Sequence, residues 1–546
     1  MNNAIFSLDK PLNEPIQSYA PGCVERKALV AELEKLSKGT IEIPCIINGK
    51  EVFTGVTEKI VMPHDHGHVL AIAHKATERE VWMAIEAANH AHKAWAETPW
   101  VDRLSITLKI AELIAKKYRP LINASTMLGQ SKNVFQAEID AVCETVDFLR
   151  FNAYFMSDIY NAQPHSEPGI LNRIEYRPLE GFVFAISPFN FTSISANLSL
   201  APALMGNTVI WKPSSTSLFS NYFLMQIFQE AGLPDGVINF LPGDGPEIGE
   251  LVIPHRDLGA IHFTGSNRSF NRIWQTIGKN LESYKSYPRI VGETGGKDFV
   301  MVHPTAGVNE VATALVRGAF EYQGQKCSAA SRAYLPESLW PAIQSKMAEM
   351  IQEIKMGPPT DFGNFMNAVI DEKAFDRIMG YIEKAHNASD AKIIFGGTGD
   401  KSIGYFVEPT VILTTNPHFS TMEEEIFGPV LSIFVYKDKD FEDTLYLIDQ
   451  TSPYALTGAV FARDRSVLNK ADEILKYAAG NFYFNDKPTG AVVGQQPFGG
   501  SRQSGTNDKA GSQLNLFRWV SPRTIKENLI PPTDYKYPFM NPETTF

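Results

Sequence analysis

The middle of the chain alternates short apolar segments with longer stretches of helical spacing. Each apolar segment ends at a polar or glycine-containing turn. Regular alternation of this kind predicts right-handed β-α-β units, and therefore a parallel sheet with helices on both faces. The predicted strands are GFVFAI (181–186), NTVIWK (207–212), GVINFL (236–241), GAIHFTG (259–265) and RIVGE (289–293).

A second strand and helix series runs from about 297 to 503, with clear strands at 299–303 and 430–436. It predicts a second α/β domain. Residues 158–178 and the tail after 513 contain isolated strand-like runs with no core of their own, so we expect them to pair with a second subunit.

Two local signals precede the first sheet. Residues 41–52 alternate like a hairpin with Asn48-Gly49 at its turn. Thr77 and Glu80 have the spacing of a capping box, and apolar residues at helical spacing follow them.

Ligands of parallel sheets bind beyond the carboxyl ends of the strands. The residues just after each predicted strand are therefore the first candidates for a site. They are Asn190, Lys212, 243–245, Gly265-Ser266 and Glu293.

Length and charge restrict the kinds of partner. A chain of 546 residues suffices for two or three domains, and its net charge of −11 disfavours nucleic acid and membrane surfaces. Small molecules are the expected partners. The start of the chain has neither a secretory signal nor a presequence pattern, and no apolar run is long enough to span a membrane. We expect a cytoplasmic protein, or a mitochondrial matrix protein whose presequence has been removed.

Cys327 is the candidate nucleophile. It lies in QGQKCSAAS (323–331), a polar, glycine-containing setting that favours a loop entering a helix. The other cysteines, Cys23, Cys45 and Cys143, lack that setting and are expected to be inert. Four cysteines without C-x-x-C spacing predict neither a disulfide framework nor a zinc site, and they favour a reducing compartment.

Two further side chains could act on a bound carbonyl. Glu293 begins ETGGKD, where the turn would raise its carboxylate into a cleft, although a capping or salt-bridging role is the commoner fate of a glutamate. Asn190 follows a strand in SPFNF (187–191), and its amide could donate to an oxyanion, a contact worth about 3 kcal/mol in kcat. Satisfying loop backbone is the alternative for Asn190.

Lys212 and Gly265-Ser266 end neighbouring strands and could hold a ribose hydroxyl and a pyrophosphate. GDGPEIG (243–249) misses the G-x-G-x-x-G spacing by one position and carries little weight. HDHGH (64–68) has no acid or cysteine at ligand spacing, so we interpret it as a solvated turn and expect no metal.

Seven strings, in order and in spacing, resemble the aldehyde dehydrogenase superfamily from about 45 to 510. They are SPFNF, WKPSS (211–215), FTGS (263–266), ETGGKD, QGQKCSA, EEIFGP (424–429) and PFGG (497–500). The resemblance implies the α/β aldehyde dehydrogenase fold, with a Rossmann-like cofactor domain, an α/β catalytic domain and a β oligomerisation arm. The domains implied are 1–296 for NAD binding, with an oligomerisation hairpin at about 158–178, 297–512 for catalysis and 513–546 as an oligomerisation tail.

The resemblance also implies roles for the candidates. Cys327 would attack an aldehyde, Asn190 would hold the oxyanion, NAD would accept a hydride and Glu293 would activate the hydrolytic water. The positions that match cofactor contacts are Ser187, Lys212, Ser215, Gly265, Ser266, Glu425 and Phe427. Many relatives have an acid in place of Ser215, so the residues alone do not fix the preference for NAD over NADP.

Within the superfamily, residues 488–511, the opening LNEPIQSYAPG (12–22) and Phe270 resemble members that oxidise L-glutamate γ-semialdehyde in proline breakdown. The amides of Gly490 and Ala491 would then bind the substrate carboxylate. Ser328 would add a hydroxyl, and Phe191 and Phe498 would flank the aliphatic stem. The expected assembly is a homo-oligomer, a dimer or an assembly of dimers.

Three alternatives remain open from the sequence. They are a CoA-acylating enzyme, an aldehyde dehydrogenase of broader specificity, and a catalytically silent structural protein. An intact set of Cys327, Glu293 and Asn190 disfavours the last, and Glu293 disfavours the first because a hydrolytic base would waste the thioester.

Overall fold

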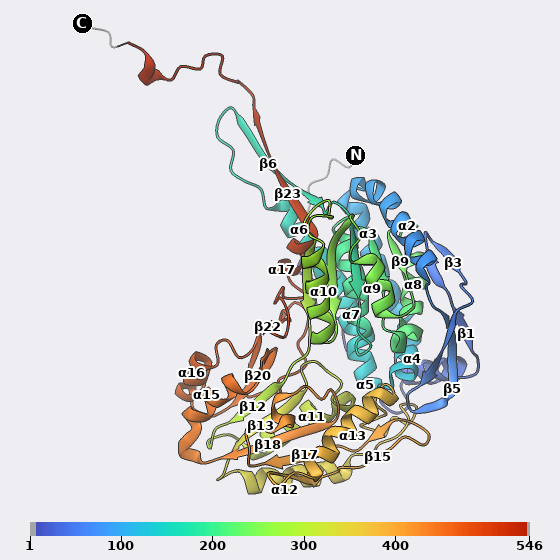
Figure 1. The fold of residues 1–546 in the computed structure, drawn as a ribbon, viewed down its shortest axis with the longest axis vertical. Coiled ribbons are helices and arrows are strands. Elements are labelled where there is room, and N and C mark those ends of the chain that lie inside the picture. The colour runs from blue at the N-terminus through green and yellow to red at the C-terminus, as the bar shows by residue number, and fades with distance from the viewer. Residues whose placement is uncertain (1–6, 543–546) are drawn as a thin grey trace.

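Two parallel sheets, each covered by helices on both faces, form the body of the chain (Figure 1). The computed structural model describes residues 7–542. The first sheet confirms the five predicted strands and adds an antiparallel pair at one edge. Its order is β11 (Arg289–Glu293), β10 (Leu258–Thr264), β7 (Phe182–Ile186), β8 (Val209–Lys212), β9 (Ile238–Phe240), β2 (Cys45–Ile47) and β3 (Lys50–Val52).

Side-chain alternation along the strands builds a core on each face of this sheet. Phe182 and Phe184 of β7 pack into one core, and Val183 and Ala185 into the other. The first core is covered by α2 (Glu78–Glu97), α9 (Gly245–Val252) and α10 (Asn267–Lys279). The second is covered by α1 (Val24–Leu36), α3 (Trp100–Glu112), α4 (Arg119–Gln130), α6 (Thr145–Asn161), α7 (Thr192–Leu204) and α8 (Leu218–Ala231).

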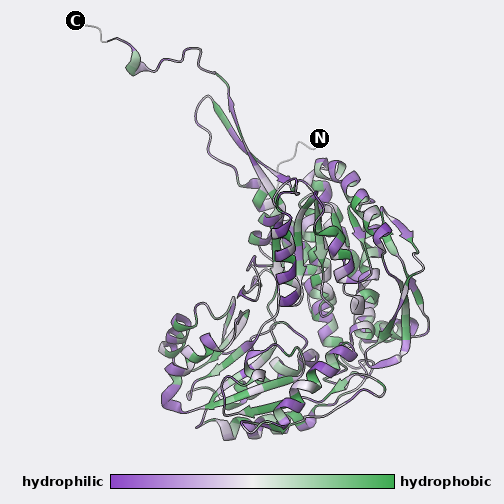
Figure 2. Ribbon diagram, in the orientation of Figure 1, coloured by the Kyte–Doolittle hydropathy of each residue, from purple (hydrophilic) through white to green (hydrophobic). Residues whose placement is uncertain are grey.

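The second sheet has the same design. Its strands are parallel except for the edge strand β14, and their order is β14 (Ala391–Phe395), β17 (Thr410–Thr414), β18 (Val430–Tyr436), β13 (Ala330–Pro336), β12 (Asp298–Val302), β20 (Thr457–Phe461) and β21 (Asn481–Phe484). One face packs on α11 (Val308–Phe320) and α12 (Trp340–Glu353). The other packs on α13 (Glu372–His386), α15 (Phe441–Thr451) and α16 (Arg465–Ile474). Figure 2 shows hydrophobic residues concentrated in the strands of this sheet.

The two local predictions near the N-terminus are confirmed. β2 and β3 form a hairpin whose turn residues, Asn48 and Gly49, both have positive φ, as a two-residue turn between twisted strands requires. The strand before them, β1 (Ile41–Ile43), belongs to a separate sheet with β5 (Asp65–His74) and β4 (Thr57–Met62). Thr77 and Glu80 form the capping box of α2.

The HDHGH segment is not a solvated turn throughout, and that prediction is wrong for two of its histidines. His64 is buried beside Ser131, and burial lowers the pKa of its imidazole to about 4. His66 stacks on Tyr405 and hydrogen-bonds the Lys401 carbonyl at 3.0 Å. The segment begins β5, so tertiary packing overrides its polar composition. Within residues 7–542, no group of three or more His, Cys, Asp or Glu residues could hold a metal ion.

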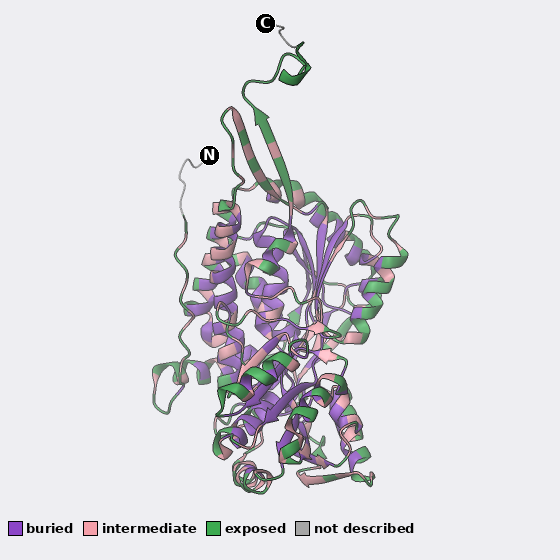
Figure 3. Ribbon diagram, turned by 90° about the vertical axis from the view of Figure 1, so that its left-hand side faces the viewer, coloured by how far each residue is buried: buried purple, intermediate pink, exposed green. Residues whose placement is uncertain are grey.

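The arm is a ribbon of two strands that are distant in sequence. β6 (Ile170–Pro178) pairs antiparallel with β23 (Val520–Asn528), and the ribbon projects from the body as mostly exposed structure (Figure 3). The hairpin predicted within 158–178 is therefore wrong. Residues 158–161 still belong to α6, and Gln163 occupies the other edge of β6 by exchanging two side-chain hydrogen bonds with the Ile174 backbone.

The chain returns to the first domain before it enters the arm. Trp519 is fully buried in the core of the first domain, where its ring contacts His262 and its carbonyl accepts a hydrogen bond from Asn207 at 2.9 Å. Residues 516–520 thus complete a core that the predicted boundary at 512 leaves out. No helix among the described residues is long and apolar enough to cross a membrane.

Candidate active site

Cys327 lies in a loop that leads into strand β13. The prediction of a loop entering a helix is wrong, because the chain from Ala330 forms strand β13, which pairs with β12 and β18 at the centre of the second sheet. Before the cysteine, Tyr322, Gln323 and Gly324 all have positive φ, which turns the chain sharply after α11. A Cβ on Gly324 would lie 2.2 Å from the Gly428 carbonyl oxygen, so this turn requires glycine.

Cys327 lines two cavities at once. The larger, of about 900 Å³, opens among the carboxyl ends of β7, β8 and β10, as expected for a ligand of a parallel sheet. The smaller, of about 430 Å³, is lined by Glu293 and by the 489–498 turn. A group bound in either cavity can therefore reach the same sulfur atom.

Most of the predicted cofactor residues line the larger cavity. They are Ser187, Lys212, Gly265, Ser266, Glu425 and Phe427, and Asn190 lies with them. Ser215 is not among the lining residues. It begins the short helix η3 (Ser215–Ser217), and the chain meets the cavity one residue earlier, at Ser214.

The near-miss glycine motif also lies at this cavity. Gly245 is the first residue of α9, and Asp244 caps that helix by accepting from the Glu247 amide at 3.2 Å. Lys212 extends to the same helix end, where a Cβ on Gly245 would lie 3.6 Å from its Nζ. Burial lowers the pKa of Lys212 to about 8, although the Asp244 carboxylate opposes the shift.

The N-termini of α9 and α10 both lie at the larger cavity. Ser266, which lines the cavity, caps α10 by accepting from the Ser269 amide. Backbone amides and the helix dipole at such ends favour a bound anion such as a pyrophosphate. Lys212 adds a cation at one of them. The larger cavity therefore suits the phosphates of a dinucleotide.

Glu425 lines this cavity and is held by the backbone of ETGGKD. Its carboxylate accepts from the Gly296 amide at 3.0 Å, and a Cβ on Gly295 would lie 2.1 Å from its Oε2. The two glycines of ETGGKD therefore admit the Glu425 side chain, a reason for them that the sequence alone did not reveal. Burial raises the pKa of Glu425 to about 7. Beside it, the rings of Phe427 and Phe189 meet edge to face, 5.8 Å between centroids.

The predicted substrate residues all line the smaller cavity together with Cys327 and Glu293. They are Phe191, Ser328, Gly490, Ala491 and Phe498. Ser328 shares a hydrogen bond of 2.8 Å with the Thr489 hydroxyl, and Gly490 has a φ of 100°. The positive φ turns the backbone sharply at the predicted anchoring residues.

Glu293 is the last residue of β11, and its carbonyl accepts from the Gly265 amide at the end of β10. Among the described residues, its buried Oε1 has no hydrogen-bond partner. Burial raises the pKa of this carboxyl to about 8, against the opposing effect of the Lys509 ammonium. A carboxylate of that pKa can act as a general base near neutral pH.

Asn190 and Cys327 both line the larger cavity, and a hydrogen bond joins Asn190 to the loop of Cys327. The Asn190 amide donates to the Gln325 carbonyl at 3.1 Å, two residues before the nucleophile. Burial raises the pKa of the Cys327 thiol well above its usual range, and the Glu293 and Asp298 carboxylates reinforce the shift. The resting thiol is therefore favoured over the thiolate.

Sequence reasoning missed the lysines around the smaller cavity. Lys326, Lys487 and Lys509 all line it. Lys487 donates to the Thr489 carbonyl at 2.9 Å, and Lys509 donates to the Gly499 carbonyl at 3.0 Å, so both brace the anchoring segment. Lys487 directly precedes the 488–511 stretch and Lys509 lies within it, but nothing in their spacing distinguishes them from solvent-exposed lysines.

A fourth lysine, Lys132, is fully buried between two loops of the site. Its Nζ lies 2.6 Å from Asp140 and over two rings, 4.2 Å from the centroid of Phe191 and 4.4 Å from that of Tyr322. Asp140 in turn accepts from the first amides of α7. This ion pair links the Asn190–Phe191 loop to the turn before Cys327.

This pair of sheets, with one thiol between a cofactor-sized cavity and a smaller one, matches the aldehyde dehydrogenase architecture. The chain belongs to the aldehyde dehydrogenase family, whose model matches residues 54–525. This confirms the resemblance and the fold class drawn from the sequence.

Among its relatives, the mitochondrial Δ1-pyrroline-5-carboxylate dehydrogenase of Dictyostelium discoideum is 52% identical over 98% of this chain and 96% of its own length. That of Bos taurus is 48% identical over 97% and 94%. The crystal structure of the Mycobacterium tuberculosis Δ-pyrroline-5-carboxylate dehydrogenase bound with NAD superposes with a TM-score of 0.96 at 50% identity, covering 99% of this chain and 100% of that one.

Proposed function

We propose that the chain is an NAD-dependent dehydrogenase that oxidises L-glutamate γ-semialdehyde, the open form of Δ1-pyrroline-5-carboxylate, to L-glutamate, the second oxidative step of proline degradation. The observation that carries this proposal is the position of Cys327 on the walls of both cavities. The names of relatives that match almost the whole chain at about half identity support the substrate.

The residues of the larger cavity fit NAD. The N-termini of α9 and α10 would bind its pyrophosphate, Lys212 and Glu425 would bind its riboses, and Phe427 would pack near the nicotinamide. When bound, NAD supplies the acceptor for the hydride that leaves the substrate carbon. The other steps belong to side chains of this chain.

Acylation begins when Cys327 Sγ forms a bond to the aldehyde carbon. The thiol proton must leave at this point, and Glu293 lines the same cavity as a candidate acceptor. The carbonyl oxygen becomes an oxyanion, which the Asn190 side chain and the Cys327 backbone amide would hold. In this arrangement the Asn190 amide already donates to the loop of the nucleophile, which fixes its side chain beside the reacting sulfur.

Deacylation needs a water and a base. After the hydride has left, the substrate is a thioester on Cys327. Glu293 takes a proton from water as the water oxygen attacks the thioester carbon, the C–S bond breaks and the acid is released. The pKa of about 8 allows Glu293 to gain and release this proton near neutral pH.

The smaller cavity fits a short aldehyde that carries a carboxylate at its other end. The amides of Gly490 and Ala491 and the hydroxyl of Ser328 would bind that carboxylate, while Phe191 and Phe498 would flank the stem. The lysines around this cavity favour an anionic substrate through their charge.

For the assembly we propose a homo-oligomer joined through the β6–β23 ribbon, whose backbone edges and exposed apolar side chains are suited to a second copy. For the compartment we propose the cytoplasm, with the mitochondrial matrix as the alternative that the names of several relatives raise.

The direct test is an NADH-release assay with purified protein and freshly prepared Δ1-pyrroline-5-carboxylate, with NAD and NADP run in parallel. We expect turnover with free L-glutamate as product. Cys327→Ala should abolish NADH production and leave the melting temperature nearly unchanged. Residual turnover in that variant, or acyl-CoA as the product when CoA is added, would contradict the mechanism.

A further inference from the structure

The N-terminal segment of the described chain runs along the smaller cavity without helix or strand. Residues 13–19, named here the strap, lie against α4, α6 and η2 (Glu138–Glu144). Asn13, Glu14 and Ile16 line the same cavity as Cys327 and Glu293. The strap is therefore one wall of the substrate site, although the catalytic residues lie about 300 positions further along the chain.

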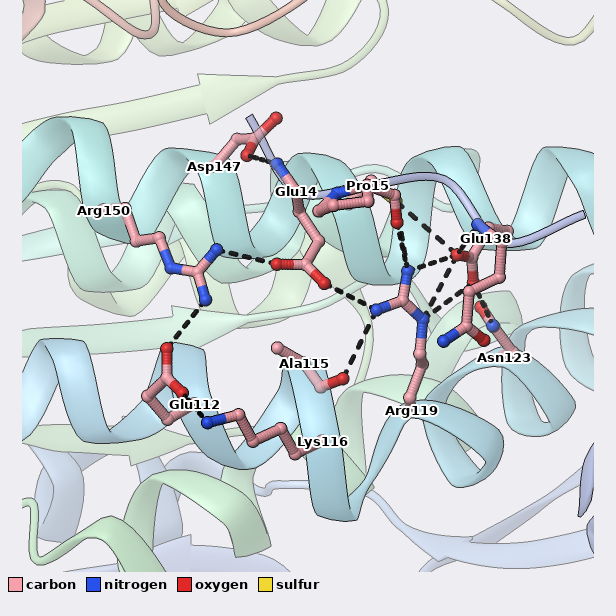
Figure 4. Close-up of polar contacts among 12 residues, drawn as sticks. Glu14, Pro15, Glu112, Ala115, Lys116, Arg119, Asn123, Glu138, Asp147 and Arg150 are labelled. Carbon is pink, nitrogen blue, oxygen red and sulfur yellow. Dashed lines mark hydrogen bonds and ion pairs between the residues drawn. The ribbon is translucent and has the colours of Figure 1, made fainter. Parts of the chain in front are cut away.

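Buried ion pairs fix the strap to the body (Figure 4). The two Glu14 oxygens bind Arg119 at 2.6 Å and Arg150 at 2.7 Å, and Arg119 also donates to the Pro15 carbonyl at 2.8 Å. Arg119 continues to Glu138, whose side chain is fully buried. If the strap moved away, it would leave a buried charge in this network without its partner. Because an unpaired buried charge costs free energy, the network holds the strap in one position.

The far end of the strap is bound to the same network. The Gln17 amide donates to Glu138 at 2.9 Å, and the Tyr19 hydroxyl donates to its other oxygen at 2.8 Å. Asn123 donates to both Tyr19 and Glu138, so every strap contact here is shared with α4 or η2. The strap is thus attached at both ends.

Asn13 connects the strap to the anchoring turn. Its amide nitrogen donates to Asp147 of α6 at 2.8 Å and to the Val493 carbonyl at 2.8 Å, and its oxygen accepts from Gln495 at 2.8 Å. Phe151 of α6 also packs against this turn, because a Cβ on Gly494 would lie 2.1 Å from its ring. The turn that carries Gly490 and Ala491 is therefore held by α6 and the strap.

The charges of the strap are compatible with an anionic ligand. Glu14 faces the cavity wall, but two arginines neutralise it. Asp147 is bound by the Glu14 amide at 2.7 Å and by Asn13, and burial raises its pKa to about 6. The arginines and hydrogen-bond donors that bind Glu14 and Asp147 therefore reduce the repulsion that free carboxylates would exert on a substrate carboxylate at Gly490 and Ala491.

We propose that the strap is a specificity-determining element of the substrate site, in which Asn13 is a positioning residue that holds the anchoring turn in its carboxylate-binding conformation. This inference rests on the proposed function for the identity of the substrate. The coupling between Asn13 and the anchoring turn does not depend on the proposed function, because it follows from the hydrogen bonds between them.

The test compares Asn13→Ala with Ser18→Ala. Ser18 is an exposed strap residue whose hydroxyl, among residues 7–542, accepts only from the Ala20 amide, so it controls for any change in the strap. For glutamate γ-semialdehyde, Asn13→Ala should raise KM about tenfold and leave kcat within about twofold. The kcat/KM for hexanal, which has no carboxylate, should stay unchanged. A parallel loss for both aldehydes, or no loss for either, would overturn the proposal.

A second measurement does not depend on any substrate. Hydrogen exchange of the amides in 490–496 should be faster in Asn13→Ala than in the unmodified protein, and unchanged in Ser18→Ala. Glu14→Gln keeps the shape of the side chain and weakens the two ion pairs, so it should move exchange and KM in the same direction by a smaller factor. Unchanged exchange in both Asn13→Ala and Glu14→Gln would overturn the coupling, whereas failure of the unmodified protein to oxidise the semialdehyde would overturn only the proposed function.

Discussion

The ring of Phe270 occupies the space in which any side chain at position 292 would lie. A Cβ added to Gly292 would be 2.2 Å from Phe270 Cε2. Gly292 immediately precedes Glu293. The packing of Phe270, in helix α10, against Gly292 therefore fixes the position of the strand that carries the proposed base.

Replacing Gly292 with Ala should therefore displace Glu293. Overpacking of this kind costs about 1–3 kcal/mol of stability, and we expect kcat to fall at least about tenfold as the base moves. Chemical denaturation and steady-state kinetics measure the two effects. Gly278→Ala, in helix α10 with open space around its Cβ, should leave kcat unchanged and should not lower the stability. Adding Phe270→Leu should restore part of both losses, and a double variant no better than Gly292→Ala would contradict the steric cause.

The pKa of Glu293 predicts the pH profile of turnover. The carboxyl is an acid whose pKa burial raises to about 8, and only its deprotonated form is a base. Deacylation should therefore rise with pH, about tenfold per unit below pH 8, and level off above it.

Glu293→Gln should remove this rise and lower kcat about 10²–10⁴-fold. A stopped-flow burst of NADH should persist in that variant if Glu293 acts mainly in deacylation. A kcat that does not change with pH from about 6 to about 9 in the unmodified protein would exclude Glu293 as the rate-limiting base.

The buried pair of Lys132 and Asp140 should contribute strongly to stability. Lys132→Met leaves a buried carboxylate without its cation, which typically costs about 3–5 kcal/mol. Lys346→Met, which breaks an exposed pair of the same 2.6 Å length with Glu349, should cost less than about 1 kcal/mol. Urea unfolding compares them, and equal losses would show that burial does not determine the difference.

The arm prediction concerns association. Leu171 on the ribbon and Ile530 just beyond it are large apolar side chains that are 46% and 80% exposed. If the ribbon joins two copies, Leu171→Asp with Ile530→Asp should shift the mass measured by light scattering toward the monomer. Ile403→Asp, at an exposed site outside the arm, is the matched control. An unchanged mass in the double variant would place the interface elsewhere.

Much of the first sheet was readable from sequence because its strands are apolar runs that end at turns, and parallel strands place their ends at one edge. Asn190, Lys212, Gly265 and Glu293 could be selected for that reason alone. The setting of Cys327 was misread because a polar loop before a buried strand looks the same as one before a helix. The predicted Ser215 lies one residue beyond Ser214, which does line the cavity, and a one-residue error is usual at the boundary of an element.

The contacts that position the site were not readable. Lys132, Asp140 and Asn13 meet partners between 8 and 482 positions away along the chain. No periodicity marks them, because each is defined by a tertiary neighbour. The arm was misassigned for the same reason, since β6 finds its partner in β23 rather than in the adjacent residues.

The burial of Trp519 has a consequence for biosynthesis. A ribosome that has completed all strands of the first sheet still lacks the Trp519 indole, which packs beside His262, and the Trp519 carbonyl, which accepts a hydrogen bond from the Asn207 amide. The first domain of the nascent chain therefore has an unfilled space in its interior until residue 519 has been translated. Premature termination anywhere before that point should leave a product that chaperones and proteases recognise as incomplete.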